Sequence, residues 1–290
     1  MVVSERSARP VDESRPGKLI GCRHQPSNSI YLSGQSTWTG DLRTITVPPE
    51  CPASRILRAT FGQPDDLDLV EDWVNSVTGE EDRSKVYGKT AVERAKKRLQ
   101  VRHYEDRDLA HYGELRLDGC QLKAFIRTGQ HRGREMFTVA HELGHASLHL
   151  LDPEFDQRAE GTERLCDLFA VEMTMPAMLV HDIWDSAPDA RAITRLARKT
   201  NCSLTASCIR IAEYNRNVTT GRAYANGYII KHYGPIAARD LRIPVEQAYR
   251  KASEKKSSWA MSNGLAVHTR TVKKLSEGPD LVVFLARRIR

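Results

Sequence analysis

Two histidines four residues apart, His141 and His145, are the side chains of this sequence best suited to metal chemistry. On a helix, residues at this spacing project from the same face, so both imidazoles can reach one ion. Glu142 points about 100° away around the helix, where it can reach a water on the ion but not easily join as a ligand. The His-Glu-x-x-His spacing therefore predicts a hydrolytic zinc site.

The surrounding residues predict the helix that this site needs. Apolar residues recur at the spacing of a half-buried helix, at Phe137, Ala140, Leu143, Gly144 and Leu148. Asp152 and Pro153 end the helix, because proline disfavours helical conformation in the residue before it.

Glu163 is the candidate for the third protein ligand that a catalytic zinc site requires. Residues 163–176 have apolar positions at helical spacing and end at Pro176, which predicts a second helix packed on the first. Asp167 lies one turn after Glu163 and can accept a hydrogen bond from the other ring nitrogen of a zinc-bound histidine. Glu163 has an alternative role, since acidic residues also stabilise the first turn of a helix.

The histidines have alternative readings as well. His141 and His145 could be ordinary helix residues and Glu142 a solvated charge. The presence of Glu163 as a candidate third ligand on the next predicted helix argues against this alternative. A metzincin would require Gly and His at positions 148 and 151, and both are leucine. We expect His149 to line a pocket or the core, with stabilisation of an oxyanion as the less favoured role.

Two stretches of the sequence resemble the ImmA/IrrE family of bacterial metallopeptidases. Residues 137–149 read FTVAHELGHASLH, where the family pattern is FTlAHELGHlllH, and residues 163–176 read ERLCDLFAVEMTMP, where it is ExxANxFAxxLLMP. The resemblance implies that zinc is bound by His141, His145 and Glu163. It also implies that Glu142 is the catalytic glutamate.

The sequence departs from that pattern at four positions. Cys166 and Asp167 replace the family's Ala and Asn, and Met173 and Thr174 replace two leucines. None of these changes removes a ligand, but a cysteine beside a metal site bears on which metal is held. Family membership implies limited cleavage of a protein substrate, typically a transcriptional repressor that controls a mobile element, a prophage or a stress response.

Composition limits the class of protein. The 290 residues are 40% hydrophobic and 28% charged, which is ordinary for a globular protein. No apolar run approaches 18 residues and the N-terminus is polar, so we expect a cytoplasmic protein with no membrane partner. The six cysteines form no CxxC pair, and we expect free thiols. The net charge of +7 permits direct DNA binding, which we consider less favoured.

Periodicity divides the chain into four predicted regions. Residues 1–52 read as a flexible or irregular extension and 53–180 as the metallopeptidase domain. Within that domain the sequence predicts a helix over 67–77, a capping box at Thr90–Glu93 that opens a basic helix, and a hairpin of 114–117 with 120–126 around Asp118–Gly119. An edge strand within 114–128 could align an extended substrate beside the metal.

The last two regions are 181–220 and 221–290. Residues 192–212 predict two short helices joined by a turn, which matches either a helix-turn-helix DNA reader or a helix pair that packs on the catalytic domain. We favour packing, although basic residues of a reader are present at Arg195, Arg198, Lys199, Arg210 and Arg216. Residues 221–290 combine a helix near 244–252 with a strand at 281–285 and have no assigned role.

Together these features predict an α+β protein: a zincin-like metallopeptidase domain, a helical segment resembling a helix-turn-helix, and a small C-terminal α/β region. The predicted function is a zinc-dependent peptidase. The alternative is a DNA-associated regulator or toxin-antitoxin component that uses the zinc domain for binding or sensing.

Overall fold

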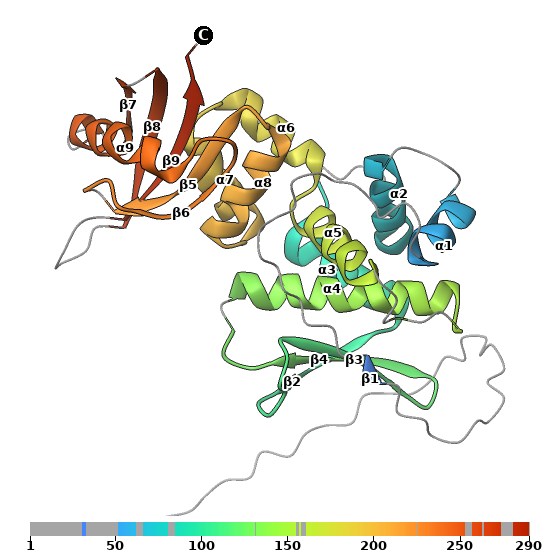
Figure 1. Ribbon diagram of the computed structural model, residues 1–290. Helices are drawn as coiled ribbons and strands as arrows, with labels where there is room; N and C mark the ends of the chain where they lie inside the picture. Colours follow the sequence, from blue (N-terminus) through green and yellow to red (C-terminus); the bar gives the residue numbers. More distant parts are fainter. Residues whose placement is uncertain are drawn as a thin grey trace, which may run out of the picture.

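A computed structural model describes most of the chain after residue 51, as residues 31–32, 52–61, 66–80, 85–130, 132–154, 157, 161–224, 226–252, 257–262, 264–273 and 281–289. The predicted N-terminal extension, 1–52, therefore lies almost wholly outside the described residues. The fold mixes helices and sheets, as the sequence predicts, with two sheets at opposite ends of a group of helices (Figure 1).

The first sheet has four strands in the order β1-β3-β4-β2. The strands are β1 (Tyr31–Leu32), β2 (Arg102–Asp106), β3 (Gly113–Asp118) and β4 (Gln121–Arg127). β3 and β4 form the predicted hairpin, but Asp118 pairs with Gln121, so the turn is Gly119-Cys120, one residue later than expected. Gly119 has φ +61°, which glycine adopts without strain.

The prediction of an edge strand within 114–128 is wrong for β4. This strand bonds to β3 on one side and to the parallel strand β2 on the other. β2 was not predicted from the sequence, because its residues, RHYED, are mostly exposed and show no apolar alternation. Within the described part of the chain, β1 pairs with β3 opposite Leu115 and Arg116.

Helix α4 (Arg132–Leu151) lies along the sheet, and α5 (Thr162–Thr174) crosses α4 (Figure 1). Three further helices, α1 (Pro52–Phe61), α2 (Asp66–Thr78) and α3 (Gly88–Leu99), complete this layer. Trp73 of α2 contacts both α5 and α4: its ring packs at a tilt against Phe169, with ring centroids 4.3 Å apart, and its Nε1 donates to Ser147 Oγ at 2.9 Å. The predicted capping box is wrong: α3 begins two residues before Thr90, and Tyr87 caps it without a side-chain hydrogen bond.

Helices α6 (Ala177–Ser186), α7 (Ala190–Thr200) and α8 (Leu204–Tyr214) follow. Asn201, in the left-handed conformation, begins the turn between α7 and α8, and Ser203 caps α8. α8 is buried over most of its surface, from Ala206 to Ala212. Arg210, one of the basic residues considered for DNA reading, is 3% exposed and bonded to Glu172, so it faces the protein interior.

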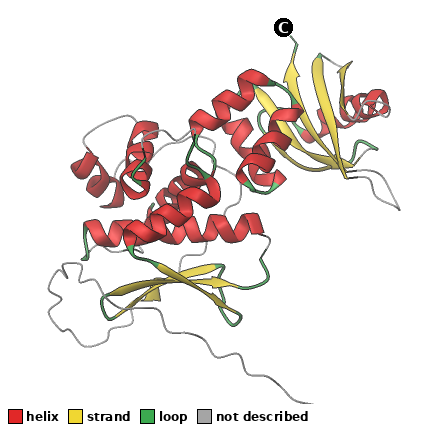
Figure 2. Ribbon diagram, turned by 180° about the vertical axis from the view of Figure 1, so that it is seen from behind, coloured by secondary structure: helices red, strands yellow, loops and turns green. Residues whose placement is uncertain are grey.

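The second sheet has five antiparallel strands in the order β6-β5-β9-β8-β7. They are β5 (Val218–Tyr224), β6 (Ile229–Tyr233), β7 (Ser257–Ser262), β8 (Leu265–Lys273) and β9 (Leu281–Arg288). Helix α9 (Ala238–Ala252) covers one face and begins six residues before the expected start at Pro244 (Figure 2). α7 and α8 contact the other side of this sheet.

Two hydrophobic cores result from this arrangement. The first runs from Ala53 through the helices to Val283 and Leu285, and the second lies between α9 and the second sheet. No helix among the described residues is both long enough and apolar enough to cross a membrane.

The expectation of free thiols is wrong for Cys120. Cys166, Cys202 and Cys208 are free and buried, whereas Cys120, in the hairpin turn, is disulfide-bonded. A disulfide depends on proximity in space, which irregular cysteine spacing did not indicate.

Candidate metal centre

Three side chains from two helices converge on one point. His141 and His145 lie in the middle of α4 and are buried, and Glu163 lies in the first turn of α5. The two Nε2 atoms are 3.2 Å apart. Glu163 Oε2 is 3.2 Å from Nε2 of His141, and Oε1 is 3.3 Å from Nε2 of His145. The helical spacing thus brings together the three residues predicted as ligands.

These separations fit a tetrahedral metal site. Zinc bonds to nitrogen and oxygen are about 2.0–2.1 Å long, and the ligand atoms of a regular tetrahedron of that size are about 3.3 Å apart. The Nε2–Nε2 separation lies within about 0.1 Å of this value, and each Nε2 is at a similar separation from one of the two Glu163 oxygens. Among the described residues, these three form a group able to hold a metal ion.

The other ring nitrogen, Nδ1, of each histidine is hydrogen-bonded to a protein side chain. His141 Nδ1 lies 2.9 Å from Oδ1 of Asp167, and His145 Nδ1 lies 3.0 Å from Oε1 of Gln157. A carboxylate only accepts hydrogen bonds, so His141 Nδ1 donates, and Nδ1 of His145 donates likewise to the amide oxygen. Gln157 was missed by the sequence analysis; it lies between the two helices, where no periodic pattern marks it.

This donor pattern favours a positive charge at the centre. With a proton on each Nδ1, the Nε2 atoms of the neutral imidazoles present lone pairs to each other and to the carboxylate. Glu163 Oε2 is buried without a hydrogen-bond partner. Burial lowers the pKa of His141, but Asp167 and Glu163 outweigh it and raise that pKa well above its usual value, so without a metal ion a proton on Nε2 supplies the positive charge. The residues therefore fit a bound cation.

Glu142 is placed apart from the ligands, as expected for a base. It is 3% exposed, and burial raises the pKa of its carboxyl group. The carboxylate rests against Gly113 of β3, where an added Cβ would lie 2.6 Å from Glu142 Oε1 and 2.4 Å from Cγ2 of Thr138. Only glycine leaves room for Glu142 in this position.

Cys166 does not belong to the metal group. Its side chain is fully buried between α4 and α5, and a Cβ added to Gly144 would lie 3.3 Å from its Cα and Sγ. Gly144 thus permits the close helix crossing that brings Glu163 to the histidines. The cysteine that replaces the family's alanine packs in this interface.

His149 lies in the last turn of α4, half-buried. Burial lowers its pKa, which favours the neutral imidazole. It is not part of the metal group of the described residues, and its role in stabilising an oxyanion stays a prediction.

Comparison with known proteins agrees with this geometry. Residues 98–212 match a peptidase family described as the IrrE N-terminal-like domain. The chain is also similar to the radiation response metalloprotease IrrE of Deinococcus deserti, at 36% identity over 90 residues. That alignment covers 28% of this chain and 32% of the relative, so the chain spans about a third of the length of the curated relative it matches.

A solved structure, a transcriptional regulator of Mycobacterium tuberculosis, is similar to 81% of this chain and 80% of its own chain, with a TM-score of 0.46 and 14% identity. The family match covers β2 to α8 and includes every residue of the metal group, on a mixed fold of the kind that zincin-like peptidases have. Residues 98–212 of this chain, which include the whole metal group, are therefore similar to the IrrE N-terminal-like peptidase domain.

Proposed function

We propose that this protein is a zinc-dependent peptidase that cleaves a protein substrate at a limited number of bonds, and that the substrate is a transcriptional repressor. The observation that carries the proposal is the group of His141, His145 and Glu163, with tetrahedral separations and both histidines held through Nδ1. Similarity to the IrrE N-terminal-like peptidase domain supports the reaction class, and the repressor is inferred from the resemblance.

When bound, zinc supplies a Lewis acid that polarises the carbonyl of the scissile peptide bond. Glu142 is suited to take the proton of the attacking water and return it to the leaving amine. Its burial raises its pKa, which makes its carboxylate a stronger base than an exposed glutamate. Asp167 and Gln157 fix the tautomers and ring orientations of the two histidines.

Cleavage of a repressor encoded beside the gene tests the function directly. We expect the zinc-loaded protein to cut this repressor and the Glu142→Gln variant to bind zinc but not cut. Product formation is followed by gel electrophoresis and mass spectrometry, and metal content by atomic absorption. Cutting by Glu142→Gln at the wild-type rate would contradict the role of Glu142.

Zinc titration tests the ligand set. We expect Glu163→Ala to lose zinc binding almost completely, because two histidines alone hold zinc weakly. Asp167→Ala and Gln157→Ala should each weaken zinc binding about ten- to a hundredfold, because a histidine loses its orienting partner. Asp167→Asn, which keeps an accepting oxygen, should be close to wild type.

The matched control is Glu154→Ala, an exposed acidic residue in the turn after α4. It should leave the zinc dissociation constant unchanged in the same competition assay. Undiminished zinc in Glu163→Ala would refute the third ligand.

The second candidate function is a DNA-associated regulator that uses the metal centre for binding or sensing. It draws support from the net charge of +7 and from the helix pair α7–α8, although the burial of α8 argues against that helix as a groove reader. Relief of repression by Glu142→Gln in stoichiometric amounts would favour this function over catalysis.

A further inference from the structure

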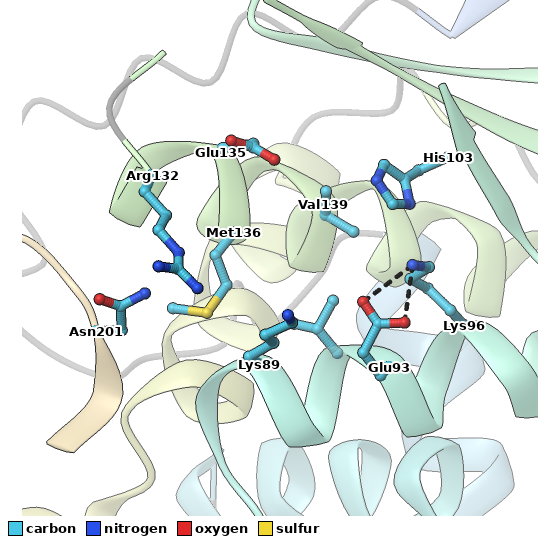
Figure 3. A pocket seen from close by; sticks show the side chains of 10 residues that line it. Lys89, Glu93, Lys96, His103, Arg132, Glu135, Met136, Val139 and Asn201 are labelled. Carbon is cyan, nitrogen blue, oxygen red and sulfur yellow. Dashed lines mark hydrogen bonds and ion pairs between the residues drawn. The ribbon is translucent and has the colours of Figure 1, made fainter. Parts of the chain in front are cut away.

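Two hollows flank the first half of α4, and they lie on different faces of that helix. The smaller, about 230 Å³, lies between α3 and α4 and is lined by Lys89, Glu93 and Arg132 among others (Figure 3). Glu93 is already bonded to Lys96 there. The larger, about 710 Å³, lies where the start of α4 meets α8, β5 and β6, and we call it the interdomain cavity.

The interdomain cavity is on the metal face of α4. Its lining residues on this helix, Gly133, Arg134 and Phe137, fall within about one quarter-turn of the direction of His141 at 100° per residue. Arg134 lies seven residues before His141, so the two Cα atoms are about 10.5 Å apart along the helix axis. Residues that line the smaller hollow, such as Arg132 and Met136, point to the opposite side.

One wall leads from the cavity towards Glu142 through Arg134, Tyr112 and Gly113. The guanidinium of Arg134 lies over the ring of Tyr112 at 4.7 Å. Tyr112 precedes Gly113, which contacts the Glu142 carboxylate. An extended peptide that follows this wall covers the distance in about three to four residues, at about 3.3 Å per residue.

The chemistry of the cavity is apolar with positive charge. Its apolar lining includes Phe137, Met175 and Ile209, and its cations are Arg134, Arg222 and Lys231. None of the residues that line it is acidic. Arg222 lines the cavity, and among the described residues its buried Nε has no hydrogen-bond partner.

We propose that the interdomain cavity is a substrate subsite that binds an acidic residue next to a large apolar one, three to four residues from the scissile bond. This inference rests on the proposed peptidase function. The volume of about 710 Å³ is in the range that holds a ligand of several hundred daltons, and so accommodates two side chains. Arg222 and Lys231 lie outside the residues matched by the family, so the second sheet supplies two of the three cations of this subsite.

The test is a cleavage-specificity profile of the full chain. A proteome-derived peptide library is digested with the zinc-loaded protein, and new termini are identified by mass spectrometry. We expect Asp or Glu to be enriched severalfold at one position three to four residues from the cut. Each of the single variants Arg222→Gln and Lys231→Gln should reduce this enrichment. The double variant Arg222→Glu/Lys231→Glu should replace it with enrichment of Lys and Arg.

Arg216→Glu is the matched control, since Arg216 is an exposed cation in the turn between α8 and β5 that does not line the cavity. Its profile should equal the wild-type profile. Cleavage without acidic enrichment, or enrichment that both cavity variants leave intact, would overturn the subsite.

A binding measurement separates failure of the subsite from failure of catalysis. Fluorescein-labelled peptides containing Asp-Leu-Glu-Phe or Asn-Leu-Gln-Phe are titrated against the zinc-loaded Glu142→Gln variant, and anisotropy is recorded. We expect the acidic peptide to bind at least tenfold more tightly, with the difference lost in the added Arg222→Gln background. If the wild type cuts no peptide while this preference is present, the peptidase function fails but the anion-binding cavity stands; equal affinities overturn the cavity.

Discussion

Gly113 sets the position of Glu142 through the absence of a side chain. A Cβ at this position would approach Glu142 Oε1 to 2.6 Å, which no relaxed structure tolerates. We expect Gly113→Ala to lower kcat about ten- to a hundredfold, because small displacements of a catalytic group have effects of this size. Zinc content should be unchanged, since His141, His145 and Glu163 do not contact Gly113. Steady-state kinetics with metal analysis measures both quantities.

A double variant identifies which contact causes the loss. Thr138→Ser removes the Cγ2 that an added Cβ would approach to 2.4 Å, while keeping the hydroxyl that donates to the Arg134 carbonyl. The clash with Glu142 persists in Gly113→Ala/Thr138→Ser. Full recovery of kcat in this double variant would show that Gly113 acts through Thr138 and not through Glu142.

The residues of the metal group were predictable to the extent that they lie on helices. Four residues separate His141 from His145 on α4, and four separate Glu163 from Asp167 on α5. A regular helix places residues at this spacing on a shared face. Gln157 belongs to the connection between α4 and α5 and carries no such signal. Gly113 lies at the start of a strand, and only the packing of β3 on α4 explains why it must be glycine.

At the scale of elements, a buried ion pair joins the helix that carries Glu163 to the helices that follow. Arg210 of α8 donates from Nη2 to Glu172 Oε2 at 2.7 Å and from Nε to the Met175 carbonyl at 2.9 Å. Glu172 also accepts from the backbone of Ala177, the first residue of α6. Both charged side chains are less than 5% exposed. This network fixes α5, α6 and α8 to one another.

Removal of one partner should therefore be costly. We expect Arg210→Met to lower the free energy of unfolding by about 3–5 kcal/mol, because it leaves the Glu172 carboxylate buried without its counterion. Urea denaturation at neutral pH measures the change. Arg216→Met, at an exposed position six residues later, should stay within about 0.5 kcal/mol of wild type. A loss at Arg210 as small as that at Arg216 would mean that the pair does not support the fold.

The sequence predicted most of the elements with apolar periodicity: α2, α4, α5, α7, α8, β9 and the β3–β4 hairpin. It also predicted α3 and α9, although both begin earlier than expected. β2 and most of the second sheet were not predicted. Strands such as β5, VTTGRAY, bury threonine and glycine as well as apolar residues, so burial in the tertiary fold decides the strand and not the local pattern. The buried position of Arg210 was also hidden, since a lone arginine on a helix usually faces water.

At the scale of the whole molecule, His268 joins the second sheet to the helices. Its Nδ1 accepts a hydrogen bond from the backbone N–H of Ala190, the first residue of α7, at 3.1 Å. Acceptance requires the neutral imidazole. Burial lowers the pKa of His268, Arg191 and Arg270 act in the same direction, and Asp189 opposes them. The contribution of His268 to stability is thus full above the pKa of the unfolded chain, about 6.5, and is lost as pH falls through the lower pKa of the folded state.

We expect His268→Leu to be about 1–3 kcal/mol less stable than wild type at pH 7.5, because the Ala190 N–H loses its acceptor. The difference should shrink as pH falls below about 6.5, because the unfolded wild-type chain then takes up a proton that the folded His268 resists. Urea denaturation with chelator present at pH 7.5 and at pH 5 excludes a contribution from metal release. His181→Leu, at an exposed histidine of α6, serves as the control, and a difference for His268→Leu that is constant with pH would contradict the role of the neutral imidazole.

The convergence of ligands from α4 and α5 has a thermodynamic consequence. An ion held by His141, His145 and Glu163 crosslinks the two helices, and the unfolded chain has no comparable site. Each tenfold rise in free ion above its dissociation constant then adds about 1.4 kcal/mol to the stability of the folded state. The abundance of the folded protein in a cell is therefore coupled to the supply of the ion, independently of any bond that the protein cuts.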